Sequence, residues 1–286
     1  MGSFQAQKKS TMNLLFIFCL SFFFLLKPVN TNAQEEGCLI KFIANEGFLV
    51  NCDSRNILID ALHHTNYKDG INSTPLHLAD SIINAQGIFS DIDLFLVSHN
   101  HRDHFSPELT YSFLSGHKES NMISNNGTYN QLRGQYPDYH AILPNRFLNL
   151  NPEPGKYADT ILNDIRLSCF SVNHMPEEGK YLTLAFYIEV GEWKILHLGD
   201  LYADTNTEVF KKLKINNKCV DILMVDHMFL LSDKGQYILN NFIQPKEIIA
   251  MHIAPDEIAD RKSELQEAFP DIIIFAKQGE TKLFNK

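Results

Sequence analysis

The sequence predicts an α/β fold in which two β-sheets carry helices packed on the outside. Strand-like runs open the chain after residue 37, and strand–helix alternation then follows twice. The composition is that of a globular domain, because 44% of the 286 residues are hydrophobic and 21% are charged. No linker or short repeat interrupts residues 37–286, so we expect a single domain over this range.

The first 33 residues have the organisation of a secretory signal peptide. Lys8 and Lys9 precede the apolar run 13–26, and small residues lead to a cleavage site after Ala33. An uncleaved membrane anchor is the alternative, but this run has 14 residues, whereas a bilayer span needs roughly 20. We therefore expect cleavage, export to the periplasm or the extracellular space, and no stable membrane span in the mature protein.

The remaining chain is acidic. Residues 1–33 hold three lysines and no acids, so their removal changes the net charge from −9 to −12. Phosphate backbones bind to basic surfaces, and no cluster of more than two Lys or Arg side chains follows the signal. This balance argues against nucleic acid and favours a small-molecule substrate.

The early strands are punctuated by Gly and Asn, and the helices by proline starts. Cys38 and Cys52 lie symmetrically about the turn at 45–47, which fits either a disulfide or two separate half-buried thiols. Ser106 is placed as an N-cap, with Pro107 in the first turn. The expected elements are strands at 39–43, 48–51 and 57–60, a helix at 75–87, a strand at 93–97 and a helix from Ser106.

The second half repeats this logic. Two strand runs separated by "GEW" predict a hairpin, and buried strands then alternate with helices. The expected elements are strands at 165–171, 181–190 and 194–198, a helix at 205–213, a strand at 219–225, a helix at 235–242, a strand at 247–251, a helix at 256–268 and a strand at 272–275.

The segment "LFLVSHNHRDHFSPE" places three histidines and an aspartate just after a buried strand. In extended backbone His99 and His101 point the same way, so both can bind one ion. A turn into the helix at Ser106 would bring Asp103 and His104 to a second position beside the first. Imidazole and carboxylate are ligands that zinc accepts. The segment therefore predicts a metal site, with a histidine-rich polar loop as the alternative.

Four further motifs each place a polar residue at the end of an apolar strand. They are "NILIDA" with Asp60, "SVNHMP" with His174, "KILHLGDLY" with Asp200, and "IIAMHIAP" with His252. Because strand ends can converge on one rim, these residues strengthen the prediction of a metal site.

"HNHRDH" matches the HxHxDH signature of the metallo-β-lactamase superfamily, and the other four motifs appear in the order typical of that superfamily. The resemblance spans essentially the whole chain after the signal. It implies a four-layer αβ/βα sandwich, with two mixed β-sheets flanked by helices and a metal site along one edge.

The resemblance also implies two divalent metal ions, zinc or alternatively manganese, and a bridging hydroxide that attacks a carbonyl or phosphorus centre. Asp103 and Asp200 would be the catalytic residues, with Asp103 orienting the hydroxide. The implied ligands are His99, His101 and His174 for the first ion, Asp103, His104 and His252 for the second, and Asp200 for both, with Asp60 as hydrogen-bonding support.

Two more histidines are candidates for binding substrate. His227 follows a buried strand in "VDHMF", and His63 closely follows Asp60. A structural role for His227 and a solvated loop for His63 are the alternatives. His197, inside the strand before Asp200, is expected to support the site or belong to the core.

The segment "DIRLSCFSVNHMP" and the strands after it resemble the group related to ascorbate-6-phosphate lactonase. The best-known secreted β-lactamases have a cysteine where this chain has Asp200, so antibiotic hydrolysis is disfavoured. We expect a secreted dinuclear-zinc hydrolase that cleaves an ester, lactone or related bond in a small molecule. The alternatives are a metal-dependent phosphodiesterase or phospholipase, and a non-catalytic binding protein on the same fold.

Overall fold

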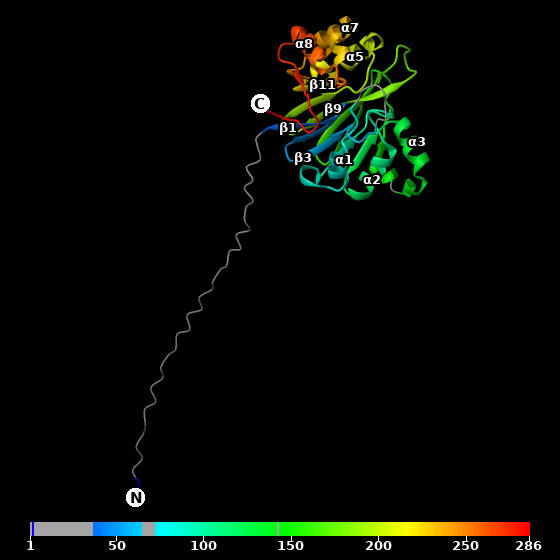
Figure 1. Ribbon diagram of the computed structural model, residues 1–286. Coiled ribbons are helices and arrows are strands. Elements are labelled where there is room, and N and C mark those ends of the chain that lie inside the picture. The colour runs from blue at the N-terminus through cyan, green and yellow to red at the C-terminus, as the bar shows by residue number, and fades with distance from the viewer. Residues whose placement is uncertain (1, 3–36, 65–71, 142) are drawn as a thin grey trace. The chain divides into compact units, whose positions relative to one another are not determined.

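The computed structural model describes residue 2 and residues 37–64, 72–141 and 143–286. The predicted signal peptide therefore lies outside the described residues, apart from Gly2. Within the described part, no helix is both long enough and apolar enough to cross a membrane. The domain contains two seven-stranded mixed sheets (Figure 1).

The first sheet begins as the antiparallel meander that the sequence predicts. Its other strands run parallel to one another from β3 onward, and the last strand of the chain returns to pair with β1. In spatial order the strands are β14 (Thr281–Phe284), β1 (Cys38–Ala44), β2 (Gly47–Cys52), β3 (Arg55–Ile59), β4 (Leu94–Leu96), β5 (Asn121–Ser124) and β6 (Phe147–Asn149).

The second sheet has the same plan. Its first four strands are antiparallel, and the last four in spatial order, from β10 onward, are parallel. In chain order they are β7 (Ala158–Leu162), β8 (Ile165–Asn173), β9 (Leu182–Val190), β10 (Trp193–His197), β11 (Ile222–Asp226), β12 (Glu247–Met251) and β13 (Ile273–Ile274).

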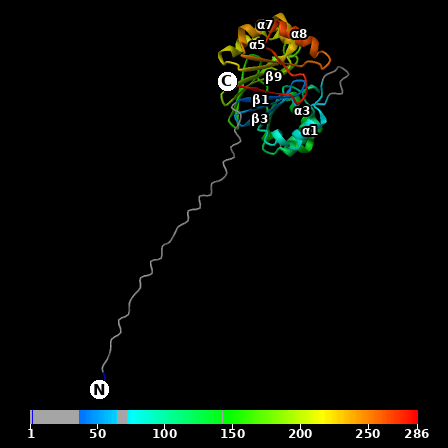
Figure 2. The same cartoon turned by 60° about the vertical axis from the view of Figure 1, so that its left-hand side comes forward.

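The helices cover the outer faces of the two sheets, as Figures 1 and 2 show from two directions. One hydrophobic cluster joins side chains of both sheets, and two others join one sheet each to its helices. This arrangement confirms the four-layer αβ/βα sandwich. The helices are α1 (Leu76–Ile83), α2 (Pro107–Gly116), α3 (Asn126–Gln135) and α4 (Leu143–Arg146) on the first sheet, and α5 (Thr207–Leu213), α6 (His227–Leu231), α7 (Asp233–Ile238) and α8 (Ile258–Ala268) on the second.

Helix ends follow local signals. The Ser106 hydroxyl accepts a hydrogen bond from the Leu109 N–H at 3.3 Å, which confirms Ser106 as the N-cap of α2. The helix predicted at 75–87 is shorter, because α1 ends at Ile83 and left-handed backbone at Ala85 and Gly87 (φ 53° and 59°) breaks it.

Cys38 and Cys52 are directly opposite in the β1–β2 register and form a disulfide, with a Cα–Cα distance of 4.4 Å. The cysteines are 14 residues apart, and closing a loop of this length stabilises a fold by about 3 kcal/mol. We therefore expect dithiothreitol to lower the free energy of unfolding by about that amount, measured by urea denaturation. The Cys38→Ser/Cys52→Ser variant should be insensitive to reductant, and an equal effect on both proteins would contradict the assignment.

Candidate metal centre

The predicted site residues leave their strands at one edge of the sandwich. Strands β3 and β4 are parallel in the first sheet, and β8, β10 and β12 point one way in the second. Residues that follow strands of the same direction meet at a common edge. The backbone N–H of Leu184 also donates to the Ser98 carbonyl at 2.9 Å, which joins the two sheets beside the histidine loop.

A glycine allows the strand β10 of the second sheet to approach the histidine loop of the first sheet closely. Gly199 has a φ of 58°, and a Cβ atom at this position would lie 2.7 Å from Thr183 Cγ2 and 2.9 Å from Ser98 Cβ. Any side chain here would push β10 away from the histidine loop. The Gly before Asp200 is therefore required for the carboxylate to reach the ligands of the first sheet.

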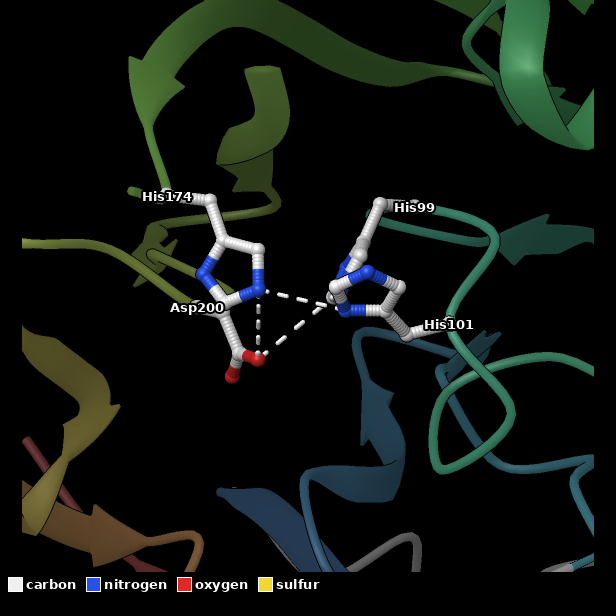
Figure 3. Close-up of side chains that lie close together, drawn as sticks. All are labelled: His99, His101, His174 and Asp200. Carbon is white, nitrogen blue, oxygen red and sulfur yellow. Dashed lines mark hydrogen bonds and ion pairs between the residues drawn. The ribbon is translucent and has the colours of Figure 1, made fainter. Parts of the chain in front are cut away.

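A first group of possible ligands consists of His99, His101, His174 and Asp200 (Figure 3). One ligand atom from each residue lies within 4.8 Å of the others. Nε2 of His174 is 3.1 Å from His101 Nδ1 and 3.5 Å from Asp200 Oδ2. Nε2 of His99 is 3.8 Å from the same Asp200 oxygen. These four residues are the ones that the resemblance implied for the first ion.

The other oxygen of Asp200 faces a second group. Oδ1 is 3.4 Å from His104 Nε2 and 3.9 Å from His252 Nε2. Asp103 joins this group, because its Oδ2 lies 3.4 Å from His252 Nε2 and 3.8 Å from His104 Nε2. Asp200 thus stands between two sets of ligands, with one carboxylate oxygen directed to each.

Asp60 is a buried carboxylate that contacts one implied ligand, His104, and hydrogen-bonds to Ser98. Its carboxylate accepts from the Ser98 N–H at 2.7 Å and the Ser98 hydroxyl at 2.6 Å, and its Oδ2 is 3.0 Å from His104 Nδ1. The contact fixes the His104 ring with Nε2 toward Asp200. This geometry agrees with the supporting role implied for Asp60.

The histidines of the two groups differ in their protonation preferences. Burial lowers the pKa of His99, His101 and His174, so these imidazoles are neutral and have lone pairs to donate. Burial alone would lower the pKa of His252, but Asp200 and Asp103 outweigh it and raise the pKa to about 9. Burial similarly opposes ionisation of Asp103, yet His252 and His104 lower its pKa to about 2.

Several atoms of the implied ligands lack a hydrogen-bond partner. His99 Nε2, His104 Nε2 and Asp200 Oδ1 are buried and have no hydrogen-bond partner within the described ranges. Buried polar atoms are normally paired. Imidazole nitrogens and carboxylate oxygens that converge without partners form the donor set of zinc or manganese, so the residues fit the implied ions.

The two predicted substrate-binding histidines are buried. His63 is fully buried, so its side chain offers no surface to a substrate in this geometry. Burial and the neighbouring His104 lower the pKa of His63 to about 4. His227 begins α6 with 5% of its surface exposed and lies 3.3 Å from Asp226 Oδ1. His197 accepts from the Gly199 N–H and donates to the Glu46 carbonyl, which is a supporting role.

Three residues of the site were not anticipated from the sequence. Ser98 touches Asp60 and two ligands, Tyr181 stacks on His101 with ring centroids 4.7 Å apart, and Glu46 lies among the second group. Ser98 directly precedes the first histidine, which was an available signal. Glu46 is in a turn between two strands, where a charged residue is normally solvated, and no sequence signal marks it.

His63 gives the fold an acid-sensitive point. Its folded-state pKa of about 4 lies below the unfolded value of 6.5, so the unfolded chain takes up the proton first and stability falls as pH drops from 6.5 to 4. With chelator present, we expect wild type to lose roughly 3 kcal/mol more than His63→Gln over this interval, by urea denaturation. The exposed-site variant His77→Gln should behave like wild type, and equal losses in all three proteins would refute the assignment.

Known proteins are similar to this chain in sequence or in fold. A metal-dependent hydrolase of Pyrococcus horikoshii is 23% identical over 167 residues, which are 57% of this chain and 68% of that protein. The metallo hydrolase Igni18 of Ignicoccus hospitalis has a TM-score of 0.55 at 16% identity, over 87% of this chain and 99% of its own. CmlA, a diiron β-hydroxylase of Streptomyces venezuelae, has a TM-score of 0.52 at 11% identity, over 88% of this chain and 54% of its own.

The two solved structures share the fold with this chain. The segment from residue 39 to residue 252 matches the family described as β-lactamase superfamily domain. It extends from β1 to the histidine that follows β12, and it contains both ligand groups. The chain therefore belongs to the β-lactamase superfamily.

Proposed function

We propose that this chain is an exported hydrolase that depends on two divalent metal ions and cleaves an ester, lactone or related bond in a small molecule. The observation that carries the proposal is the position of Asp200, whose Oδ2 faces His99 and His174 and whose Oδ1 faces His104 and His252. Zinc is the expected metal, with manganese as the alternative.

When bound, two such ions supply Lewis acidity, lower the pKa of a water molecule and polarise a substrate oxygen. The chain's own residues fix where this chemistry happens. Asp200 and Asp103 are ionised at neutral pH, because neighbouring histidines outweigh burial and lower the pKa of each carboxyl. We expect Asp103, whose Oδ2 lies 3.4 Å from His252 Nε2, to orient the attacking water.

A cleft of about 340 Å³ lies beside the first ligand group. Tyr181 forms one wall and stacks on His101, while its hydroxyl donates to Asn100 Oδ1 at 2.9 Å. Lys180 and several asparagine side chains also line the cleft. Leu182 and Leu184 add apolar wall, and a cleft of this size and mixed character suits the non-reacting part of a small-molecule substrate, such as a lactone or ester.

Export is supported by the N-terminal pattern and by the Cys38–Cys52 disulfide, since structural disulfides belong to oxidising compartments. N-terminal sequencing of the exported protein should begin at Gln34. A retained apolar segment would instead indicate an anchor.

The test of the reaction is a substrate screen across lactones, carboxylic esters, phosphodiesters and β-lactams, with zinc and then manganese. We expect turnover of lactones or esters, abolished by chelator and restored by metal. Turnover of phosphodiesters alone would replace this proposal with the phosphodiesterase alternative. Two tightly bound ions without any turnover would favour the non-catalytic binding protein.

A further inference from the structure

The turn between β1 and β2 is built into the metal centre. Asn45 Nδ2 donates to the Asp103 carbonyl at 3.2 Å, and the His252 N–H donates to the Asn45 carbonyl at 3.4 Å. His197 Nε2 donates to the Glu46 carbonyl at 3.1 Å. The turn is therefore fixed by the backbone of two implied ligands and by His197 of β10. These contacts also fix the position of Glu46, which follows Asn45 in the turn.

That side chain is Glu46, and its carboxylate lies among the second ligand group. The residue is 0% exposed. One ligand atom each from Glu46, His104, Asp200 and His252 lies within 4.8 Å of the others. Glu46 Oε2 is 3.6 Å from His104 Nδ1, the ring nitrogen that also contacts Asp60. Neither oxygen of Glu46 has a hydrogen-bond partner among the residues that the structure describes.

The surroundings of Glu46 are acidic. Asp200 and Asp226 both act on it as like charges, and Asp60 lies within 4.8 Å in a further group with His197. Burying a carboxylate without hydrogen bonds beside other carboxylates is strongly unfavourable in the absence of a cation. A metal ion at the second position would balance this charge.

We propose that Glu46 is a direct ligand of the second metal position, in addition to the ligands that the superfamily resemblance implies. This inference rests on the proposed two-metal function. The second position would then have three carboxylate ligands (Glu46, Asp103 and Asp200) and two imidazoles. The first position would have three imidazoles and one carboxylate oxygen. Oxygen-rich sites suit harder cations, so the second position should favour manganese more than the first.

The test uses Mn²⁺ alone as the probe. The full chain is freed of metal with chelator and titrated with Mn²⁺, and free Mn²⁺ is followed by its electron paramagnetic resonance signal. Wild type should bind two ions. Glu46→Gln, which keeps the shape and removes the charge, should retain the first ion and bind the second more than about 100-fold more weakly. Glu267→Gln, at an exposed position of α8, is the matched control and should behave like wild type.

Glu46→Asp is the second variant, because it keeps the charge but withdraws it from the ion. It should weaken the second Mn²⁺ and leave the first unchanged, and it tests the proposal even if Glu46→Gln does not fold. Wild-type affinity for both ions in either folded variant would overturn the proposal while leaving the two-metal function intact. Wild-type protein that binds fewer than two ions would instead refute the two-metal function itself.

Discussion

Replacing Asp200 with alanine should abolish hydrolysis and reduce the bound metal from two ions per chain to one or none. The carboxylate is 3.4–3.9 Å from four imidazole nitrogens and divides its two oxygens between the two groups. We expect kcat/KM to fall by more than about 10³-fold, on the scale lost with a catalytic acid–base group. Elemental analysis and turnover of the substrate found in the screen measure the two effects.

The matched control is Asp204→Ala, because Asp204 is exposed four residues later in the chain. It should keep both ions and full turnover. Circular dichroism establishes that each variant is folded. A folded Asp200→Ala protein with two ions and unchanged turnover would show that Asp200 does not bridge the metals.

Replacing Asp60 with asparagine should weaken metal binding without touching a ligand. The Asp60 carboxylate accepts two hydrogen bonds from Ser98 and contacts His104 Nδ1, all in a fully buried position. The amide can reproduce the shape but not the charge that orients His104. We expect affinity for the second ion to fall 10- to 100-fold by Mn²⁺ titration. The free energy of unfolding should also fall by about 3 kcal/mol, because a buried pair loses its charged partner.

Asp80→Asn is the control for this variant, since Asp80 is exposed on α1. Its metal affinity and stability should match those of wild type. If Asp60→Asn is destabilised but binds metal normally, Asp60 contributes to the fold and not to the orientation of His104.

Much of the candidate site followed from the sequence because each ligand motif ends an apolar strand. Apolar runs such as β4 and β12 predict buried strands, and parallel strands bring their ends to a common edge. The positions of Asp60, His174 and His252 in space could therefore be anticipated from their positions in the chain. The start of α2 could likewise be anticipated, because Ser106 followed by Pro107 is a typical N-terminal helix signal.

Other features depend on contacts that no local pattern encodes. The strands β5, β6 and β7 have only three to five residues each, and β7 alternates between partly buried and exposed positions, so periodicity over 121–162 is weak. β14 is defined by its pairing with β1, more than 230 residues earlier. Glu46 and His63 are polar residues outside regular strands, and the opposite sheet and the histidine loop bury them.

The fold leaves substrate choice to side chains around the metals. Igni18 is described as a metallo hydrolase and CmlA as a diiron β-hydroxylase, yet both share this architecture. Different reactions therefore occur on one scaffold, as is general for widespread folds. In this chain the cleft walled by Tyr181 and Asn100 is where specificity should be sought by mutation.

The most direct measurement is anomalous X-ray diffraction from crystals of the zinc-loaded or manganese-loaded protein. The two-metal account predicts two anomalous peaks about 3.5–4 Å apart, one on each side of the Asp200 carboxylate. The first peak should contact His99, His101 and His174, and the second should contact His104 and His252. A single peak, or two peaks that do not share Asp200, would contradict the account.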